Sequence, residues 1–337
     1  MSATTSSMLT PATNWPIAFD DVIAARERLR PFLPPTPLRN YPLLDELVGE
    51  GIQVFVKHEN HQPTQAFKVR NGLNSIAALD AAARARGVVG ASTGNHGQGL
   101  AWAGRELGVR VTICVPEGNN PEKNAAIRGY GAELVEAGET YDDACTAADI
   151  VVAERGATLI HSTNNRDVIA GAATMSLEML EQEHDLDAIV VSVGGGSQAV
   201  GAITVAREIR PSLRVYGVQS GAAPAVRQAW ITGEVRDLPK PATFAEGIAT
   251  GRAYDLTLGA LRQGLAGFEL VSERELEIAL RALLTITHNL PEGAGAAALA
   301  GLLKLRSELK GQRVAIVMSG GNLDTKVLGR ILSEVRT

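Results

Sequence analysis

The residue with the clearest chemical potential in this 337-residue chain is Lys68, within the stretch His58–Arg70 (HENHQPTQAFKVR). A strand-like run, Gln53–Lys57, precedes it and an apolar-periodic segment, Val69–Arg86, follows it, so we expect Lys68 to open a helix. A cation is disfavoured at the positive end of a helix dipole. The lysine pKa should therefore be lowered, which favours a neutral amine able to form an imine. The alternative is a solvated lysine on a first turn, and the other motifs of the chain argue against it.

A second stretch, Ala91–Gly99 (ASTGNHGQG), joins a predicted strand to a predicted helix. Its polar side chains, Ser92, Thr93 and Asn95, and the first N–H groups of the helix together form an anion site suited to a carboxylate. An ordinary capped helix start also explains these residue types. Three closely spaced glycines make capping alone a less complete explanation.

A third stretch, Ser192–Gly201 (SVGGGSQAVG), contains three successive glycines. Such glycines let backbone amides wrap a phosphate, with the dipole of the next helix behind them. The stretch also matches the dinucleotide-binding pattern G-x-G-x-x-A, but that pattern requires an acidic residue at the end of the following strand. That strand ends in Gln219 and Ser220. A small phosphate is therefore the better ligand.

A fourth stretch, Val317–Asn322 (VMSGGN), places Ser319 at a strand end before two glycines. Its hydroxyl could bond a ring nitrogen or cap the last helix. An amine nucleophile, a phosphate loop, a carboxylate loop and a partner for a heterocycle together specify a phosphorylated aldehyde cofactor, pyridoxal 5′-phosphate (PLP).

The elements that must position these stretches alternate between strand and helix, which predicts a parallel α/β sheet with helices on both faces. Ligands bind such sheets where strands end and helices begin. The N-terminal arm Met1–Trp15 is expected to be loose, and the four prolines of Pro31–Leu38 require an extended path. The predicted strands are Val88–Ala91, Val111–Val115, Glu133–Val135, Thr158–Ile160, Ala188–Ser192, Val215–Gln219 and Val314–Val317. The predicted helices are Phe19–Leu29, His96–Leu107, Pro121–Tyr130, Tyr141–Arg155, Gln198–Ile209, Asp255–Gln263, Glu273–Thr285, Ala294–Leu309 and Leu323–Val335.

Composition excludes several classes of protein. A net charge of -5 and a pI near 5.8 leave no basic face for nucleic acid. Two cysteines, Cys114 and Cys145, are too few for a disulfide framework and are expected to be buried. No apolar run reaches the roughly 18 residues of a membrane span, and the first residues lack the pattern of an export signal. We expect a cytoplasmic protein that does not associate with membranes.

These motifs resemble the fold-type II PLP enzymes of the threonine/serine dehydratase (ammonia-lyase) and serine racemase family. PTQAFKVR resembles the family's lysine motif, STGNHGQG its substrate-carboxylate loop, VGGGS its phosphate loop and MSGGN its ring-nitrogen serine. Further matching stretches, from PTPL to PEGAGAAALAGL, follow in the family's order over nearly the whole chain. The resemblance implies a tryptophan synthase β-like α/β fold with two open, twisted, mostly parallel sheets and helices on both faces. It implies a large domain, 1–87 and 161–337, and a small inserted domain, 88–160, which closes over the substrate.

The resemblance also assigns roles to individual residues. Lys68 is implied to hold PLP covalently and later to move the α-proton, and Asn95 to bond the cofactor's 3′-oxygen. Thr93 occupies the position of the serine hydroxyl that racemases use on the opposite ring face. Glu292 resembles a glutamate near the ring, although a helix-start carboxylate is an equally good interpretation. The remaining cofactor residues are Phe67, Gly194, Gly195, Gly196, Ser197, Gln198 and Ser319, and the substrate residues are Ser92, Thr93, Gly94, Asn95, His96, Thr163 and Asn164.

The chain departs from the family pattern at four places. Before Phe-Lys, the chain has Gln65-Ala66 in place of a glycine and a small residue. In the phosphate loop, Ser197 replaces the fourth glycine. The stretches Ser162–Arg166 and Gly171–Thr174 also differ from the family pattern. The last two border the family's side-chain pocket, so a bulkier or more polar substrate competes with threonine or serine. Relatives that bind a divalent cation place a Glu, a backbone carbonyl and an Asp where this chain has Gln219, Ala223 and Ala225. Both carboxylates are missing here, so we expect no metal there.

The function that follows is a PLP-dependent lyase that eliminates water from an L-β-hydroxy amino acid of the threonine or serine type, giving a 2-oxo acid and ammonia. Alternatives are a dehydratase for phenylserine or 3-hydroxyaspartate, a serine racemase, and, from another class, a PLP- or amino-acid-binding module without turnover. The family further implies a homodimer or homotetramer. Because no regulatory domain follows before Thr337, it also implies a short, catabolic-type enzyme.

Overall fold

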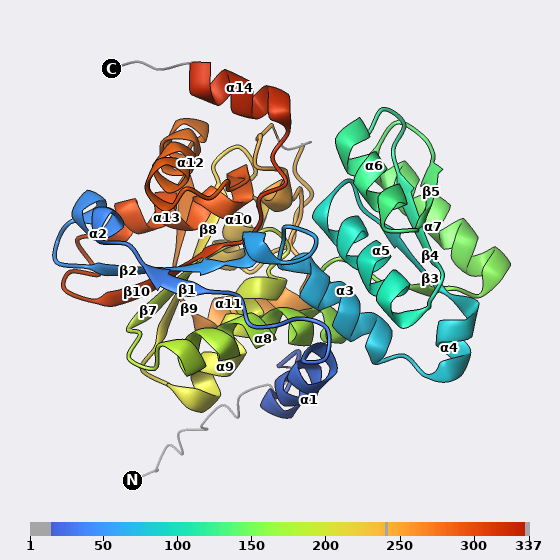
Figure 1. The fold of residues 1–337 in the computed structure, drawn as a ribbon, viewed down its shortest axis with the longest axis horizontal. Coiled ribbons are helices and arrows are strands. Elements are labelled where there is room, and N and C mark those ends of the chain that lie inside the picture. The colour runs from blue at the N-terminus through green and yellow to red at the C-terminus, as the bar shows by residue number, and fades with distance from the viewer. Residues whose placement is uncertain (1–14, 240–241, 334–337) are drawn as a thin grey trace, which may run out of the picture.

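The computed structural model describes residues 15–239 and 242–333, so most of the arm expected at Met1–Trp15 lies outside the described residues. Two separate sheets organise the chain, as Figure 1 shows. Helix α3 (Lys68–Ala77) lies between them near the centre of the view. Among the described residues, no helix is long and apolar enough to cross a membrane.

The larger sheet has six strands, and five of them run parallel to one another. The first strand pairs antiparallel with the second, which fits the expectation of a mostly parallel sheet. In spatial order the strands are β1 (Leu38–Asn40), β2 (Gln53–His58), β10 (Arg313–Met318), β7 (Ala188–Ser192), β8 (Arg214–Ser220) and β9 (Leu265–Val271).

The smaller sheet has four parallel strands, all drawn from the segment between residues 88 and 159. In spatial order they are β5 (Glu133–Glu136), β4 (Val111–Val115), β3 (Val88–Ala91) and β6 (Thr158–Leu159). These strands fall within residues 88–160, and the division of the chain into a small and a large domain stays a prediction.

Helices cover both faces of the six-stranded sheet, because alternate residues of each strand point to opposite faces. In β10, Ala315 and Val317 join one core with α1, α8, α9, α10 and α11. Val314, Ile316 and Met318 join the other core with α2, α12, α13 and α14. The helices are α1 (Phe19–Leu29), α2 (Pro42–Val48), α4 (Ala81–Arg86), α5 (Asn95–Leu107), α6 (Pro121–Gly129), α7 (Tyr141–Arg155), α8 (Arg166–Gln182), α9 (Ser197–Ile209), α10 (Ala225–Thr232), α11 (Asp255–Gly264), α12 (Glu273–Thr287), α13 (Gly293–Leu305) and α14 (Thr325–Ser333), with 3-10 turns η1 (Glu59–His61) and η2 (Glu246–Ile248).

Most predicted elements are confirmed, several with the same bounds, but the sequence analysis missed helix α8. All of its residues from Val168 to Leu180 are buried, so this part of the helix has no solvent-exposed face to produce an amphipathic period. Strand β9 was also missed, and helices α2 and α10 with it. The single helix expected over Val69–Arg86 is two helices, because Asp80 caps a new one by accepting from the N–H of Ala83.

Helix α3 packs unusually closely against the helices on either side of it. A Cβ atom on Gly72 would lie 2.6 Å from the carbonyl oxygen of Gly99 in α5, and one on Gly171 in α8 would lie 2.5 Å from that of Arg70. Only glycine allows backbones to approach so closely. Helix α3 is therefore in direct backbone contact with a helix of each sheet.

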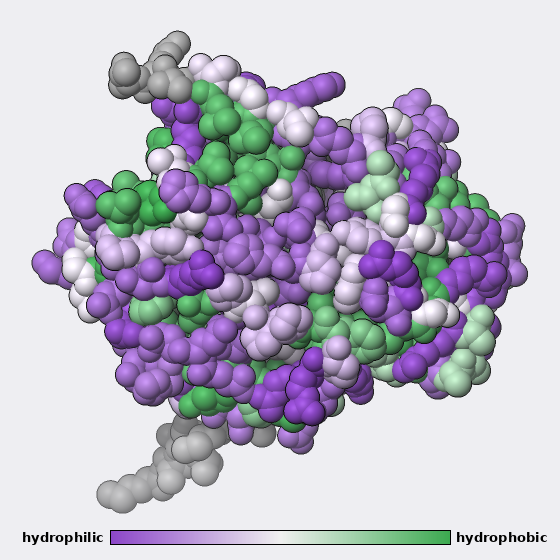
Figure 2. All heavy atoms as spheres, viewed as in Figure 1, coloured by the Kyte–Doolittle hydropathy of each residue, from purple (hydrophilic) through white to green (hydrophobic). Residues whose placement is uncertain are grey.

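The surface is mostly hydrophilic in the view of Figure 2, with a hydrophobic area around α12 and α14. Ile278 of α12 and Leu332 of α14 are exposed. Cys114 is buried as expected, whereas Cys145 is only half-buried; both are free thiols.

Candidate active site

A cavity of about 510 Å³ opens where the loops after β3, β7 and β10 meet the start of α3. Its size is ordinary for a small-molecule site. The structure gathers around it nearly every residue that the sequence analysis singled out. These are Phe67, Lys68, Ser92, Thr93, Gly94, Asn95, His96, Thr163, Gly194, Gly195, Gly196, Ser197, Gln198, Glu292 and Ser319.

Asn164 is the exception, and its place in the substrate pocket stays a prediction. Its side chain is exposed and does not line the cavity. The backbone N–H groups of Thr163 and Asn164 both donate to the His161 Nδ1 atom, at 3.0 and 2.8 Å. In this tight turn Thr163 is buried at the cavity while Asn164 is exposed.

Lys68 is the first residue of α3, and its Nζ atom donates to the carbonyl oxygen of Ser162 at 3.2 Å. Burial lowers its pKa to about 8, while the negative charge of Glu292 acts to raise it. The direction agrees with the sequence prediction, but the principal cause is loss of solvent and not the helix dipole. A substantial fraction of the amine is neutral near physiological pH, as a nucleophile requires.

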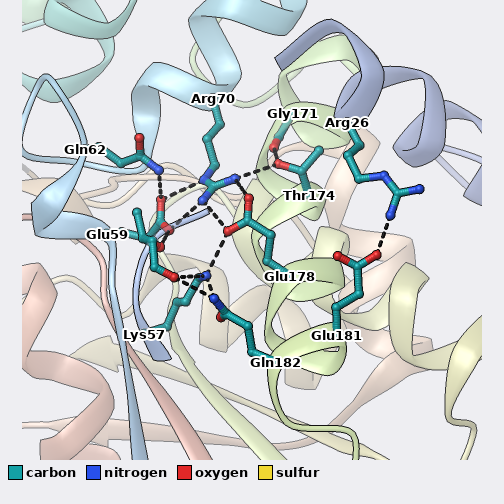
Figure 3. Close-up of polar contacts among 11 residues, drawn as sticks. Arg26, Lys57, Glu59, Gln62, Arg70, Gly171, Thr174, Glu178, Glu181 and Gln182 are labelled. Atoms are coloured by element: carbon teal, nitrogen blue, oxygen red, sulfur yellow. Dashed lines mark hydrogen bonds and ion pairs between the residues drawn. The ribbon is translucent and has the colours of Figure 1, made fainter. Parts of the chain in front are cut away.

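A buried ion cluster of Lys57, Glu59, Arg70 and Glu178 anchors the helix that carries Lys68 (Figure 3). Arg70 bonds Glu59 through Nε and Nη2, at 2.8 and 2.9 Å, and Glu178 through Nη1 and Nη2, at 2.7 and 2.8 Å. Lys57 Nζ donates to Glu178 at 2.8 Å. Because both oxygens of each carboxylate are bonded, the cluster fixes α3 two residues from the reactive amine.

The residues before Lys68 are held by the loop that carries Ser319. The N–H of Phe67 donates to the carbonyl oxygen of Ser319 at 3.0 Å, and Ala66 forms an antiparallel bridge with Gly320. Ser319 is buried at the cavity wall. The position of its hydroxyl is thereby tied to that of Lys68.

The carboxylate loop is shaped by the hydroxyl of Ser92. Its Oγ atom accepts from the N–H groups of Gly94 at 3.3 Å and Gly97 at 2.9 Å. His96 Nε2 lies 2.9 Å from the carbonyl oxygen of Ile160, and burial, aided by the charge of Lys68, lowers the His96 pKa to about 3. The neutral ring must therefore donate from Nε2, and the loop gains no positive charge from this histidine.

Glu292 immediately precedes α13 and is buried against the cavity. It occupies the N-cap position of that helix, as the helix-start interpretation requires, but its side chain makes no capping hydrogen bond there. Burial raises its pKa, while a hydrogen bond from Asn95 lowers it. The carboxyl group is thus held inside the cavity within range of Lys68.

The cavity also contains residues that the sequence analysis did not assign to the site. Tyr141 begins α7 and Tyr254 precedes α11, and both line the cavity. Lys123 and Glu246 line it as well and form an ion pair. Lys123 and Glu246 lie in stretches that match the family, and that match was the only sequence signal for them. Tyr141 and Tyr254 lie outside the matching stretches.

The predicted absence of a cation site stays a prediction. At the positions in question, the Gln219 side chain is buried and its Oε1 atom accepts from the N–H of Arg227 at 3.1 Å. Ala223 and Ala225 are buried and offer no side-chain oxygen.

Comparison with known proteins agrees with this geometry. Residues 29–320 match the family model described as "Pyridoxal-phosphate dependent enzyme". The chain belongs to this family of PLP-dependent enzymes.

It is 40% identical to the L-threonine ammonia-lyase of Geobacter sulfurreducens over 84% of this chain and 71% of that protein. It is 35% identical to the L-threo-3-hydroxyaspartate ammonia-lyase of a Pseudomonas species over 94% of this chain and 98% of that protein. The structure of maize serine racemase superposes with a TM-score of 0.90 at 29% identity, over 95% of this chain and 98% of that one. The α/β fold with two mostly parallel sheets is therefore that of the fold-type II PLP enzymes.

The residues present fit PLP. At the phosphate loop, a Cβ atom on Gly194 would lie 2.8 Å from the Gly247 carbonyl oxygen, and one on Gly195 would lie 2.2 Å from Thr163 Oγ1. Gly196 has φ 103°, which side-chain-bearing residues rarely adopt. Helix α9 begins directly after it, and the buried Nε2 atom of Gln198 has no hydrogen-bond partner among the described residues. Backbone and side-chain N–H groups that are free at a glycine-rich helix start are suited to bind a phosphate.

The structure also accommodates two departures from the family pattern. Ser197 is the first residue of α9 and is absent from the described residues with positive φ, so that position does not need glycine. Gln65, in contrast, has φ 55° where the family pattern has glycine. A side-chain-bearing residue is strained in this conformation.

Proposed function

We propose that the chain is a PLP-dependent ammonia-lyase that converts an L-β-hydroxy amino acid into a 2-oxo acid and ammonia. The observation that carries the proposal is the half-buried Lys68 amine, with its pKa lowered to about 8, at one cavity that is also lined by the carboxylate loop, the glycine loop and Ser319. The sequence relatives named as ammonia-lyases support the same reaction type.

The cofactor supplies an aldehyde that attaches the substrate amine and a ring that withdraws electrons from the α-carbon. Lys68 would hold that aldehyde at rest, and Gly194, Gly195 and Gly196 would hold the phosphate through their backbone N–H groups. Because Ser92 Oγ already accepts two hydrogen bonds, its O–H is left to donate to the substrate carboxylate. The loop thereby orients the α-carbon toward Lys68.

Lys68 Nζ then acts as the base for the α-proton, since its lowered pKa leaves a neutral amine at working pH. Ser319 would offer the heterocycle nitrogen a hydroxyl and no negative charge, which would leave a bound ring a weaker electron sink and would favour prompt loss of the β-hydroxyl with the α-proton as water.

The test is an absorbance spectrum of the purified protein with PLP, before and after addition of L-threonine, L-serine, L-threo-phenylserine and L-threo-3-hydroxyaspartate, with 2-oxo acid assayed in parallel. We expect a cofactor band that Lys68→Ala abolishes and the exposed control Lys310→Ala retains, together with 2-oxo acid from at least one substrate. A wild-type band with no 2-oxo acid from any substrate would instead favour a binding module without turnover.

Racemisation is the second candidate activity, favoured by the Thr93 hydroxyl at the cavity and by the likeness to a serine racemase structure. The β-branch of Thr93 restricts its rotamers, so we rank racemisation below elimination. Incubation with L-serine followed by chiral separation measures D-serine directly. D-serine formed faster than pyruvate would reverse this ranking.

The remaining proposals concern the assembly and location of the enzyme. We propose a homodimer or homotetramer in the cytoplasm, with the segment 88–160 closing over the bound substrate. Light scattering of the purified protein tests the oligomeric state. Hydrogen exchange of residues 88–160 with and without substrate tests the closure.

A further inference from the structure

The charges around the cavity decide which side chains a substrate can carry. Among the described lining residues, the lysines are Lys68 and Lys123, and the carboxylates are Glu246, Glu292 and Asp324. Lys123 pairs with Glu246, and Lys68 faces a carbonyl oxygen and would carry the cofactor. No unpaired cation is left among the described lining residues to receive a second substrate carboxylate.

Two tyrosines, Tyr141 at the start of α7 and Tyr254 just before α11, line the same cavity and form what we call the aromatic wall; Tyr141 is 39% exposed and Tyr254 is half-buried. The ring of His161 contacts Tyr254 edge-on, with centroids 5.0 Å apart. Burial raises the pKa of both tyrosines and lowers that of His161, so all three rings are uncharged near neutral pH. Arg252, two residues before Tyr254, is half-exposed and pairs with Asp237 away from the cavity lining.

The aromatic wall lies beside the reacting groups. Tyr141 Oη donates to the carbonyl oxygen of Ala91 at 3.3 Å, and Ala91 directly precedes the carboxylate loop. Tyr141 also interacts with the Ser162 side chain, and the Ser162 carbonyl oxygen receives the Lys68 amine. A substrate held by its carboxylate with its α-carbon at Lys68 would therefore direct its β-substituent into this part of the cavity.

We propose that the cavity selects an uncharged, aromatic β-substituent, so that the preferred substrate class is 3-aryl-3-hydroxy amino acids and 3-hydroxydicarboxylic ones are rejected. This inference rests on the proposed function and separates the chain from its hydroxyaspartate-named relative. The reaction remains balanced: the β-hydroxyl and the α-proton leave as water, and water then displaces ammonia to give the 3-aryl-2-oxo acid. Each ring contact favours an aromatic ligand roughly 2- to 10-fold, and an unpaired buried carboxylate is disfavoured by roughly 10-fold or more.

The experiment compares kcat/KM of the PLP-loaded enzyme for L-threo-phenylserine, L-threonine and L-threo-3-hydroxyaspartate, with 2-oxo acid as product. We expect phenylserine to exceed threonine and hydroxyaspartate to be at least roughly 10-fold below both. Tyr141→Leu and Tyr254→Leu should each lower the phenylserine/threonine ratio roughly 2- to 10-fold, mainly through KM, and the Phe variants should retain it. Tyr130→Phe, remote from the cavity lining, is the matched control.

A hydroxyaspartate kcat/KM equal to or above that of phenylserine overturns the inference while leaving the lyase assignment intact. If the phenylserine/threonine ratio of kcat/KM is unchanged in both Leu variants, the aromatic wall is not the cause of the preference. If none of the three substrates yields a 2-oxo acid, the lyase assignment fails. In that case the cofactor band is titrated with L-phenylalanine and L-aspartate, and tighter binding of L-aspartate overturns the inference.

Discussion

Asn95 joins the two sheets across the cavity by a pair of hydrogen bonds that fix its amide. Its Nδ2 atom donates to Glu292 Oε1 at 2.7 Å, and its Oδ1 atom accepts from Asn322 Nδ2 at 2.8 Å. Asn95 begins α5 next to the four-stranded sheet, whereas Glu292 and Asn322 flank the six-stranded sheet. The electrostatics of Lys68 therefore depend on residues that meet only when both sheets are in place.

Replacing Glu292 by Gln should lower the pKa of Lys68 further, because the ionised carboxylate stabilises the ammonium form. PLP-free protein takes up PLP through the neutral form of this amine, so the uptake rate falls as the pH drops below the Lys68 pKa of about 8. In Glu292→Gln this fall in rate should occur at a lower pH. Stopped-flow absorbance at a series of pH values measures the uptake rate. Glu308→Gln, outside the cavity lining, is the control. A fall in uptake rate that moves to higher pH in Glu292→Gln would contradict the interaction between Glu292 and Lys68.

His96 should make the fold sensitive to acid. Burial lowers its folded pKa to about 3, below its unfolded value of 6.5, so the unfolded chain binds the proton more readily and stability falls as pH drops through this window. Between pH 7 and pH 5 the loss from this group is about 2 kcal/mol. Urea unfolding of the PLP-free protein at both pH values should show a smaller loss in His96→Gln and an unchanged loss in His184→Gln, whose side chain is exposed.

Breaking the buried ion cluster should destabilise the protein strongly. Arg70→Met leaves Glu59 and Glu178 without their main partner, which costs about 3–5 kcal/mol, and adding Glu178→Gln should recover part of this loss. Arg128→Met, which removes an exposed pair with Glu136, should cost less than about 1 kcal/mol. Denaturant unfolding checks both. Equal losses from the two arginine variants would show that the cluster does not anchor α3.

Gln65→Gly should stabilise the protein by up to about 1 kcal/mol, since glycine relieves the left-handed backbone at this position and loses part of the gain to chain entropy. Gln65→Ala keeps the Cβ atom and should show no such gain. Thermal melting compares the three proteins. A lower melting temperature for Gln65→Gly would mean that the Gln65 side chain contributes contacts that outweigh its strain.

The sequence alone determined the cofactor class and most of the secondary structure, and it predicted the residues of the cofactor site. Lys68, Gly194–Gly196 and Ser319 stand at strand or helix ends with local signals strong enough to be recognised, because a reactive lysine, successive glycines and a strand-end serine each have a short-range chemical reason. The alternation of apolar strands and helices likewise gave the α/β class without reference to any distant contact.

Only the tertiary structure decided what surrounds these groups. Helix α8 was missed because burial on all sides removes the period that would identify it. The pKa of Lys68 is set by burial and by Glu292, more than 200 residues away along the chain, and not mainly by its own helix. The aromatic wall combines Tyr141 and Tyr254, which carry no local signal and meet at one cavity only through packing of the two sheets. Local patterns report backbone conformation, whereas solvation and charge depend on neighbours brought together by the fold.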